Sequence, residues 1–426
     1  MKSKRIAAIC LCITILTAGC AQIDSNKELG TNREEYQDTV ALVTDPYGPL
    51  LKNCAATNAG YYELLLSADG TANNILYTDF ATTQRIYLCN TPNCTHDNDR
   101  CTSWCPYTTG GSYLFTSLDG QKLYYVQRGT EDGAASDGAS TGKIFVMNAD
   151  GSEKKVLVDI GASGRISDAI AADSQSIYID INTVDSWNAD PQTELWRVNA
   201  ATGEVEVLVR KLPDTDRLFG AFDTNLLFQS QTETGYAFKA YDLKTRTFTD
   251  LISWNYSDFE GVNIVYGHRL FILKKLENNL GNLEVYDLRN MEKTTIQNVP
   301  IYAGDTTQIC GFYDDENFVY DITDNTDLNS IRFLRYYANI SDGTVSELTL
   351  KGMRNGYQRP DRILCEAGGS LLVQYGSYTG TVKSVYEGRL TEMSMPDAQR
   401  MGLIAKADFF ANTPNITPIA DSVISG

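Results

Sequence analysis

Short apolar strands separated by polar turns recur along the chain from about residue 60 onward. Six segments each hold two strands rich in β-branched and aromatic residues, joined by a tight turn of Asn, Asp, Gly or Thr. This pattern predicts a β-hairpin in each segment. The six segments are residues 74–88, 142–158, 193–209, 236–252, 282–296 and 332–348. Their turns follow at intervals of roughly 43 to 70 residues, the range of propeller blades with insertions.

Two further strands precede each hairpin, so that a repeating unit contains four strands. The nearer one is short and apolar, as in LYYVQRG (123–129), SIYIDIN (176–182) and LLFQSQT (226–232). A weaker unit begins at RILCEAG (362–368) and ends the series. Together with a first unit at 60–90, the pattern predicts an all-β protein, a β-propeller of seven four-stranded blades, with six or eight as neighbouring counts. A pair of β-sandwiches and a β-helix are the alternative architectures, and the aperiodic insertions argue against a β-helix.

The first unit is one strand short in the sequence pattern. A propeller closes its ring by pairing the ends of the chain, because an open strand edge invites association with other chains. The C-terminal segment LIAKADFFANTPNITPI, residues 403–419, is therefore expected to supply the missing strand.

The N-terminus has the layout of a secretory signal. The cations of MKSKR precede the apolar run IAAICLCITIL (6–16), and the small-residue site TAGC ends at Cys20. This layout resembles a bacterial lipoprotein signal, in which Cys20 becomes the lipidated first residue. The apolar run is too short for a transmembrane anchor, and a cleaved signal without lipid is the other alternative.

The residues after Cys20 are polar with little periodicity, and they are expected to form a flexible tether. The predicted organisation is a lipoprotein signal peptide at 1–19, a tether at 20–45 and a single propeller domain at 46–426. The expected location is extracytoplasmic, with the lipid anchoring the protein to the bacterial cell membrane.

The chain is strongly acidic, with a formal net charge of −18, and no basic patch stands out in its sequence. A polyanion of this kind repels nucleic acid and anionic membrane surfaces. Nucleic acid is therefore not an expected partner, and membrane contact is expected only through the lipid anchor.

Three stretches of sequence resemble known propellers. IFVMNADGSEKKVLV (144–158) is similar to the blade repeat of TolB-type propellers. LYTDFATTQRIYLCNTPNCTHDNDRC (76–101) and the ending LIAKADFFANTPNITPI resemble an uncharacterised family of lipoprotein propellers from anaerobic Firmicutes, over most of residues 60–420. This resemblance implies the propeller fold and the extracytoplasmic location, and it carries no known activity.

Irregular segments are expected to gather at one end of the blades. In a four-stranded meander of strands A to D, the A–B and C–D turns lie at one end, which we call the turn face. The B–C loops and the D-to-next-A connections lie at the other end, the loop-rich face, which receives the segments 129–142, 184–192 and 253–259. Long loops on a rigid scaffold commonly carry binding residues. The expected binding residues are Trp104, Trp187, Trp254 and Tyr256.

The expected partner at this face is an unidentified protein or glycan. The alternative for each of these aromatic side chains is simple packing between blades.

Four of the ten cysteines and one of the two histidines lie between Tyr87 and Cys105, in a stretch expected on the loop-rich face after the last strand of the first unit. Three thiolates and one imidazole make a tetrahedral Zn²⁺ site. One structural zinc held by Cys89, Cys94, His96 and Cys101 fits that count. The resemblance to the lipoprotein propellers points to the same four residues. Disulfides are the alternative in an extracytoplasmic protein, and free thiols are a third.

Seven cysteines remain besides Cys20 once the signal is removed, and seven cannot all pair within one chain. Cys54 is a candidate partner for Cys105. Cys310 and Cys365 lie on the first strands of the last two units, where burial as small apolar side chains is favoured over pairing with each other. A zinc held by four protein ligands leaves no open position for substrate, so the expected role of the stretch is structural.

No catalytic motif is present. The chain lacks G-x-S-x-G, H-E-x-x-H and P-loop patterns, and its only histidines are His96 and His268, the latter expected in an ordinary A–B turn. The acidic stretch 312–329 is interpreted as solvated turns rather than a calcium site, because it lacks the EF-hand order. Non-catalytic binding is therefore the favoured function. A carbohydrate-active or lyase-type enzyme that uses carboxylates at the channel mouth is the alternative, and a purely structural envelope component is a third possibility.

Overall fold

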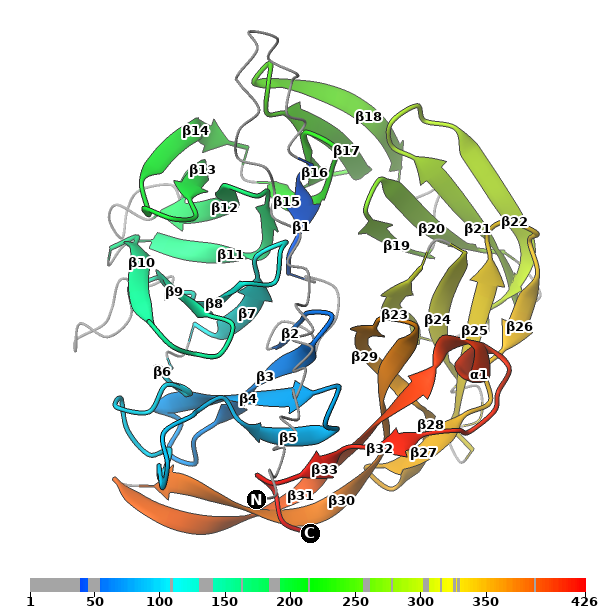
Figure 1. Ribbon diagram of the computed structural model, residues 1–426. Coiled ribbons are helices and arrows are strands. Elements are labelled where there is room, and N and C mark those ends of the chain that lie inside the picture. The colour runs from blue at the N-terminus through cyan, green and yellow to red at the C-terminus, as the bar shows by residue number, and fades with distance from the viewer. Residues whose placement is uncertain are drawn as a thin grey trace, which may run out of the picture. The chain divides into compact units, whose positions relative to one another are not determined.

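The structure is a computed structural model in which the chain divides into residues 1–37 and residues 38–426. It describes residues 39–44, 54–107, 110–129, 141–161, 164–183, 192–213, 215–255, 261–276, 279–301, 306–314, 316–324, 327, 330–386 and 388–426. The second unit is a ring of seven antiparallel blades (Figure 1). This ring confirms the predicted all-β propeller with seven four-stranded blades.

Each blade uses four consecutive strands, and the innermost strand comes first. Blades 1 to 3 are β2 (Cys54–Ala56), β3 (Gly60–Leu66), β4 (Ala72–Asp79), β5 (Gln84–Tyr87); β7 (Ser112–Thr116), β8 (Lys122–Gln127), β9 (Lys143–Asn148), β10 (Lys155–Asp159); and β11 (Gly164–Ala172), β12 (Ser176–Thr183), β13 (Gln192–Asn199), β14 (Val205–Leu212). Blades 4 and 5 are β15 (Asp216–Phe222), β16 (Asn225–Gln231), β17 (Gly235–Asp242), β18 (Thr247–Asn255); and β19 (Gly261–Tyr266), β20 (Arg269–Lys275), β21 (Leu280–Asp287), β22 (Lys293–Pro300). Blades 6 and 7 are β23 (Thr306–Tyr313), β24 (Asn317–Asp324), β25 (Arg332–Asn339), β26 (Val345–Glu347); and β29 (Arg362–Ala367), β30 (Ser370–Tyr386), β31 (Arg389–Ala405), β32 (Thr417–Pro418).

The blades are packed on both sides by their neighbours, which explains why many strands are apolar on both faces. Phe271 of β20 and Phe318 of β24 stack across the junction of blades 5 and 6, with ring centroids 4.6 Å apart. Both side chains are fully buried. Aromatic burial of this kind, repeated between blades, supplies the core that an open four-stranded sheet lacks.

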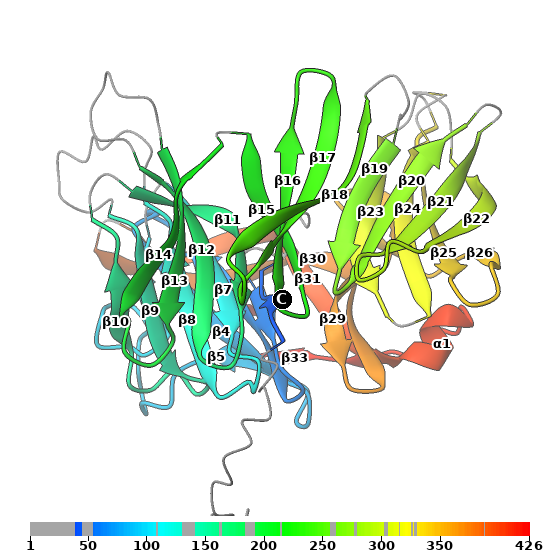
Figure 2. The ribbon, with the colours of Figure 1, turned by 90° about the horizontal axis from the view of Figure 1, so that it is seen from above.

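The C–D turns are tight because a residue in each adopts a left-handed conformation. In blade 3 this residue is Gly203, with φ 76°, and a Cβ there would lie 2.0 Å from the carbonyl oxygen of Leu157 in blade 2. Glycine is therefore required by the backbone and by the neighbouring blade. Figure 2 shows the ring edge-on, with the blade strands running between its two faces. In the part of the chain that the structure describes, the one helix, α1 (Lys406–Phe410), is too short to cross a membrane.

Residues 39–44 belong to the propeller, although they lie in the stretch predicted as a tether. Strand β1 (Ala41–Leu42) pairs antiparallel with β11, the innermost strand of blade 3. Val40 is 2% exposed and donates its amide to the carbonyl of Asp223, in the A–B turn of blade 4. The chain therefore enters the ring beside the turn face and runs inward from there.

The first blade is complete without help from the C-terminus, which corrects the expected closure. Strand β2 supplies its innermost strand and was missed because Cys-Ala-Ala holds no β-branched or aromatic residue. The segment 403–419 instead holds the end of β31, α1 and β32, so it completes blade 7. The chain then continues into β33 (Ala420–Asp421), which pairs parallel with β5 on the outer edge of blade 1.

A long hairpin of blade 7 also reaches blade 1. Strands β30 and β31 are 17 residues each, and their far halves extend past their own blade (Figure 1). The Asp69 amide donates to the Val385 carbonyl at 3.1 Å, and the Ala68 amide donates to Ser384 Oγ at 2.9 Å. Blade 1 is therefore held by this hairpin on one side and by the chain end on another.

Arg85 lies at the centre of this closure. It is 4% exposed, and its Nε lies 2.7 Å from Glu63 Oε1 while its Nη1 lies 2.6 Å from Asp421 Oδ2. Burial alone would lower the pKa of Arg85, but the two carboxylates outweigh burial and raise it. A buried cation shared between blade 1 and β33 ties the end of the chain to its beginning.

We predict that Asp421→Asn destabilises the protein by about 2 kcal/mol, because it removes one of the two charges that compensate buried Arg85. Asp250→Asn, at an exposed position on β18, is the matched control and should change stability little. Urea unfolding of both variants measures the difference. Equal midpoints for the two variants would show that the chain end does not close the ring.

Candidate metal centre

The cysteine-rich stretch is an insertion within the outermost strand of blade 1. Strand β5 pairs with the second half of β4, and β6 (Trp104–Pro106) pairs with the first half of the same strand. Between them, Ile75 accepts a hydrogen bond from the Leu88 amide and donates to the Ser103 carbonyl, so the chain leaves and rejoins β4 at one point. The sequence had placed this stretch after the last strand of blade 1, on the loop-rich face. The structure places it within that strand instead, at the outer rim of the blade.

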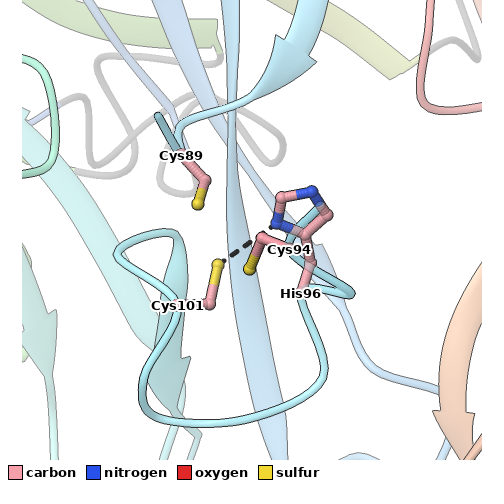
Figure 3. Close-up of side chains that lie close together, drawn as sticks. All are labelled: Cys89, Cys94, His96 and Cys101. Atoms are coloured by element: carbon pink, nitrogen blue, oxygen red, sulfur yellow. Dashed lines mark hydrogen bonds between the residues drawn. The ribbon is translucent and has the colours of Figure 1, made fainter. Parts of the chain in front are cut away.

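Four side chains of the insertion converge on one point (Figure 3). The ligand atoms of Cys89, Cys94, His96 and Cys101 all lie within 4.8 Å of one another. His96 Nδ1 is 3.2 Å from Cys101 Sγ. Cys101 is buried and the other three are half-buried. Three sulfurs and one imidazole nitrogen at these separations fit the donor set of a structural zinc.

Neighbouring side chains orient two of the four ligands. Ser103 Oγ lies 3.0 Å from Cys101 Sγ and donates to Asn74 Oδ1 at 3.0 Å, while Asn74 Nδ2 donates to the His96 carbonyl at 3.2 Å. Tyr87 stacks on the His96 ring with centroids 4.1 Å apart. Contacts of this kind fix the orientation of metal ligands and are a regular part of zinc sites.

Without a metal, the ligands differ in the direction in which the protein shifts their pKa values. Burial raises the pKa of the Cys101 thiol to about 12. Burial also opposes ionisation of Cys89, but hydrogen bonds, led by the backbone of Thr91, outweigh it and lower the pKa of Cys89 to about 7. Burial lowers the pKa of His96, which favours the neutral imidazole that a metal requires. Zinc would bind the thiolate forms and displace the remaining thiol protons.

Cys89, Cys94, Cys101, Cys105 and Cys365 are free thiols. The predicted pairing of Cys54 with Cys105 is wrong, because the two pack in different clusters. Cys105 packs with Leu114 and Tyr125 between blades 1 and 2, whereas Cys54 packs with Cys365 against blade 7. The side chain of Cys310 lies outside the described residues.

Of the four predicted binding aromatics, the structure describes Trp104 and Trp254, which lie in different blades. Trp104 lies half-buried on β6 of blade 1, where its carbonyl accepts a hydrogen bond from Lys154. Trp254 lies on β18 of blade 4 and packs on Phe238, with ring centroids 5.4 Å apart. Trp187 and Tyr256 lie outside the described residues.

Two further sequence expectations can be compared with the structure. His268 lies in the A–B turn of blade 5, as expected, with Nε2 3.7 Å from Asp287 Oδ2. In the acidic stretch 312–329, Asp314 accepts backbone amides of its own turn, Asp321 pairs with Arg335, and Asp324 pairs with Arg332. These described carboxylates have partners that need no calcium.

Charged residues on the first and second strands of the blades were missed by sequence reasoning. Asp168 pairs with Arg128 at 2.6 Å, and Asp216 pairs with Lys239 and accepts a hydrogen bond from Ser230. Asp180 of β12 is 0% exposed, and burial raises its pKa to about 6. The available signal was an acid in an otherwise apolar strand, as in SIYIDIN, where Asp180 stands.

The described cavities do not single out the loop-rich face. A cavity of about 690 Å³ opens between the turns of blades 2 and 3 and is lined by Leu118, Tyr124 and Asp173, among others. A second, of about 410 Å³, lies between the metal centre and the closure and is lined by His96 and Asp421, among others. Several loops of the loop-rich face fall outside the described residues.

The propeller fold is shared with solved structures at low sequence identity. Pyrococcus horikoshii acylaminoacyl peptidase matches at 11% identity with a TM-score of 0.50, over 89% of this chain and 52% of that chain. The β-propeller domain of the Trilobed protease from Pyrococcus furiosus matches at 11% identity with a TM-score of 0.48, over 89% of this chain and 98% of that chain. TolB from Acinetobacter baumannii matches at 14% identity with a TM-score of 0.32, over 81% of this chain and 79% of that chain. This chain spans about half the length of the peptidase, and at such identities the likeness shows the fold alone.

No family model and no curated protein matches the chain. A TolB propeller is among the matching structures, whereas membership of a lipoprotein family from Firmicutes stays a prediction.

We predict that the protein, purified without added metal, contains about one zinc per chain. Cys94→Ser should lose the metal, because it removes one of four ligands, and Cys105→Ala should keep it. Elemental analysis of both variants and the wild type measures this. A metal-free wild type whose mass is lower by the hydrogens lost in disulfide formation would show that these cysteines form disulfides instead.

We also predict that buried Asp180 makes stability depend on pH. Its folded pKa lies above its ordinary value, so its stabilising contribution is present at low pH and is lost as the pH rises through about 6. Between pH 4 and 7, the wild type should therefore lose up to about 3 kcal/mol relative to Asp180→Asn. Unfolding curves at several pH values measure this, with Asp250→Asn as the control. If the free energies of unfolding of the wild type and Asp180→Asn change in parallel with pH, the raised pKa of Asp180 is contradicted.

Proposed function

We propose that the protein is a lipid-tethered, extracytoplasmic propeller that binds a protein or glycan through its loop-rich face without catalysis. The observation that carries this proposal is the path of residues 39–44. Val40 bonds to the A–B turn of blade 4, and Ala41 pairs with Ala172 beside the A–B turn of blade 3, so residues 39–44 begin at the turn face. The loop-rich face, at the opposite end of the blades, is the face we assign to the ligand.

The ion pairs of three described carboxylates support binding over catalysis. Asp168, Asp216 and Asp321 each pair with an arginine or a lysine. A carboxylate neutralised in this way is a poor general base. A hydrolase or lyase would need two carboxyl groups near one scissile bond.

In the part of the chain that the structure describes, burial raises the pKa of two carboxyl groups to about 6, those of Asp180 and Asp361. They lie in blade 3 and at the entry to blade 7, so they do not form a pair. The peptidase that shares the fold is similar at 11% identity, which carries no activity to this chain.

The metal centre has a structural role in this proposal. Four protein ligands leave a zinc no open position for substrate. The centre lies where the outermost strand of blade 1 is interrupted, and cross-linking Cys89 to Cys101 would hold the two ends of the insertion together. Zinc therefore stabilises an insertion that has no apolar core of its own.

The tether is tested by Cys20→Ala, which removes the only thiol at the signal cleavage site. We predict that the variant is either released into the medium or retained as the longer, unprocessed precursor, since lipidation precedes cleavage in lipoproteins of this type. Cys12→Ala, within the apolar run, is the matched control and should behave as wild type. Membrane fractionation with mass analysis measures both, and a variant that is membrane-bound at the mature mass contradicts the lipid anchor.

The binding face is tested by charge reversal at two exposed arginines, with a screen of glycans and envelope proteins as ligands. Arg217 lies at the loop-rich end of β15, and Arg289 lies in the C–D turn of blade 5. Arg217→Glu should weaken the wild-type interactions roughly tenfold, and Arg289→Glu should leave them unchanged. The reverse result would place binding on the turn face.

A further inference from the structure

We propose that the entry to blade 7 binds an oxyanion, a carboxylate or a phosphate carried on a sugar or another ring. The site is built by Arg335, Arg354, Arg359 and Arg362, which we call the arginine cluster. This inference rests on the proposed function, because it names the ligand chemistry of one part of the loop-rich face.

The cluster is created by an extra hairpin between blades 6 and 7. Strands β27 (Lys351–Arg354) and β28 (Tyr357–Pro360) form a D-to-A connection, which lies on the loop-rich side. The hairpin packs against β25 on one side and β30 on the other. It brings Arg354 and Arg359 beside Arg335 of β25 and Arg362 at the start of β29.

Arg335 is the fixed member of the cluster. It is 2% exposed and binds Asp321 through two parallel contacts, Nε to Oδ1 at 2.6 Å and Nη2 to Oδ2 at 2.8 Å. Its Nη1 donates to the backbone carbonyl of Asp361. The hydrogen bonds of Arg335 are therefore used within the fold, and its role is to support the site.

Arg354 and Arg359 have donors that the protein leaves unused. The Nε of each is buried without an acceptor, although Arg354 Nη2 donates to the Pro360 carbonyl at 2.5 Å. Burial, together with the nearby charges of the other three arginines, lowers the pKa of Arg354 to about 10. Buried charged donors without acceptors are rare in folded proteins, and a bound anion would satisfy them.

Two described carboxyl groups, Asp321 and Asp361, lie beside the cluster. Asp321 is engaged by Arg335. Asp361 is 4% exposed with Oδ1 lacking a partner, and burial raises its pKa to about 6 even though Arg335 and Arg354 act to lower it. Among the described residues, neither Asp321 nor Asp361 gives the Nε of Arg354 or Arg359 an acceptor.

An aromatic surface beside the cluster fits a ring-bearing ligand. The Arg359 guanidinium lies 4.2 Å from the Phe333 ring centroid and 5.7 Å from that of Tyr357. Stacking fixes the plane of this guanidinium and leaves its N–H edge directed away from the rings. Tyr357 and Met353 are each 50% exposed on the same hairpin. A charged sugar could place its oxyanion on the arginines and its ring against Tyr357.

Titration calorimetry on the full-length protein tests this with three probes that share one ring: glucuronate, glucose 6-phosphate and glucose. We expect saturable binding of at least one of the two anions, weakened by salt because the contact is ionic, and no binding of glucose. Binding of glucuronate alone identifies a carboxylate site, and binding of glucose 6-phosphate alone identifies a phosphate site. Equal binding of glucose, or no binding by any probe, overturns the proposal.

Variants separate ligand contact from structural support. Arg354→Gln and Arg359→Gln should each weaken anion binding roughly tenfold or more. Arg389→Gln, an exposed arginine at the start of β31, is the matched control and should bind as wild type. Without ligand, Arg354→Gln should melt at or above the wild-type temperature, because it relieves repulsion among the arginines.

The competing explanation is an internal ion pair between Arg354 and Asp361. It predicts that Arg354→Gln melts well below the wild type and that neither anion raises the melting temperature of the wild type. That pair of results overturns the proposal even if the variant is too unstable for calorimetry. A screen that finds only neutral ligands on the loop-rich face would overturn the anion site and leave the proposed binding function intact.

Discussion

The buried ion pairs of Arg85 are the interaction on which the propeller depends. The first and last blades each consist of their own consecutive strands, and the C-terminal strand β33 is added to the outer edge of blade 1, beside β5. Closure is left to the far halves of β30 and β31 and to the last residues of the chain. Arg85 reaches from blade 1 to Glu63 within the blade and to Asp421 in β33, and its burial makes both contacts necessary. This buried cation therefore links the last strand of the chain to blade 1.

The metal centre and the closure lie next to each other and involve the same strand. Arg85 and Tyr87 both belong to β5, where Tyr87 stacks on His96 and donates to the Lys383 carbonyl of the blade 7 hairpin. A cavity of about 410 Å³ lies between these parts. A zinc that fixes His96 would therefore also steady the strand that carries Arg85. This links a local cross-link to the integrity of the whole ring.

The sequence predicted the structural elements that repeat along the chain. It missed the elements that consist of a few residues or depend on pairing between distant strands. The hairpins and the blade count follow from apolar strands and tight turns, and the convergence of Cys89, Cys94, His96 and Cys101 follows from residue type alone. Strand β2 is three small residues long, so no pattern distinguishes it from a loop. The split of the outermost strand of blade 1 depends on pairing across β4, which sequence spacing does not encode. The arginine cluster escaped notice because its members come from β25, the inserted hairpin and β29 in an acidic chain.

Hydrogen exchange at the end of the chain tests the closure most directly. The amides of Ala420, Ser422 and Ser425 donate to Thr83, Arg85 and Thr381, so they bond to blade 1 and to the hairpin of blade 7. Mass spectrometry of the C-terminal peptide should therefore show these amides exchanging as slowly as those of β12, in the middle of a blade. Exchange of the C-terminal peptide at the rate of an unfolded chain, while β12 stays protected, would contradict the account of how this propeller closes.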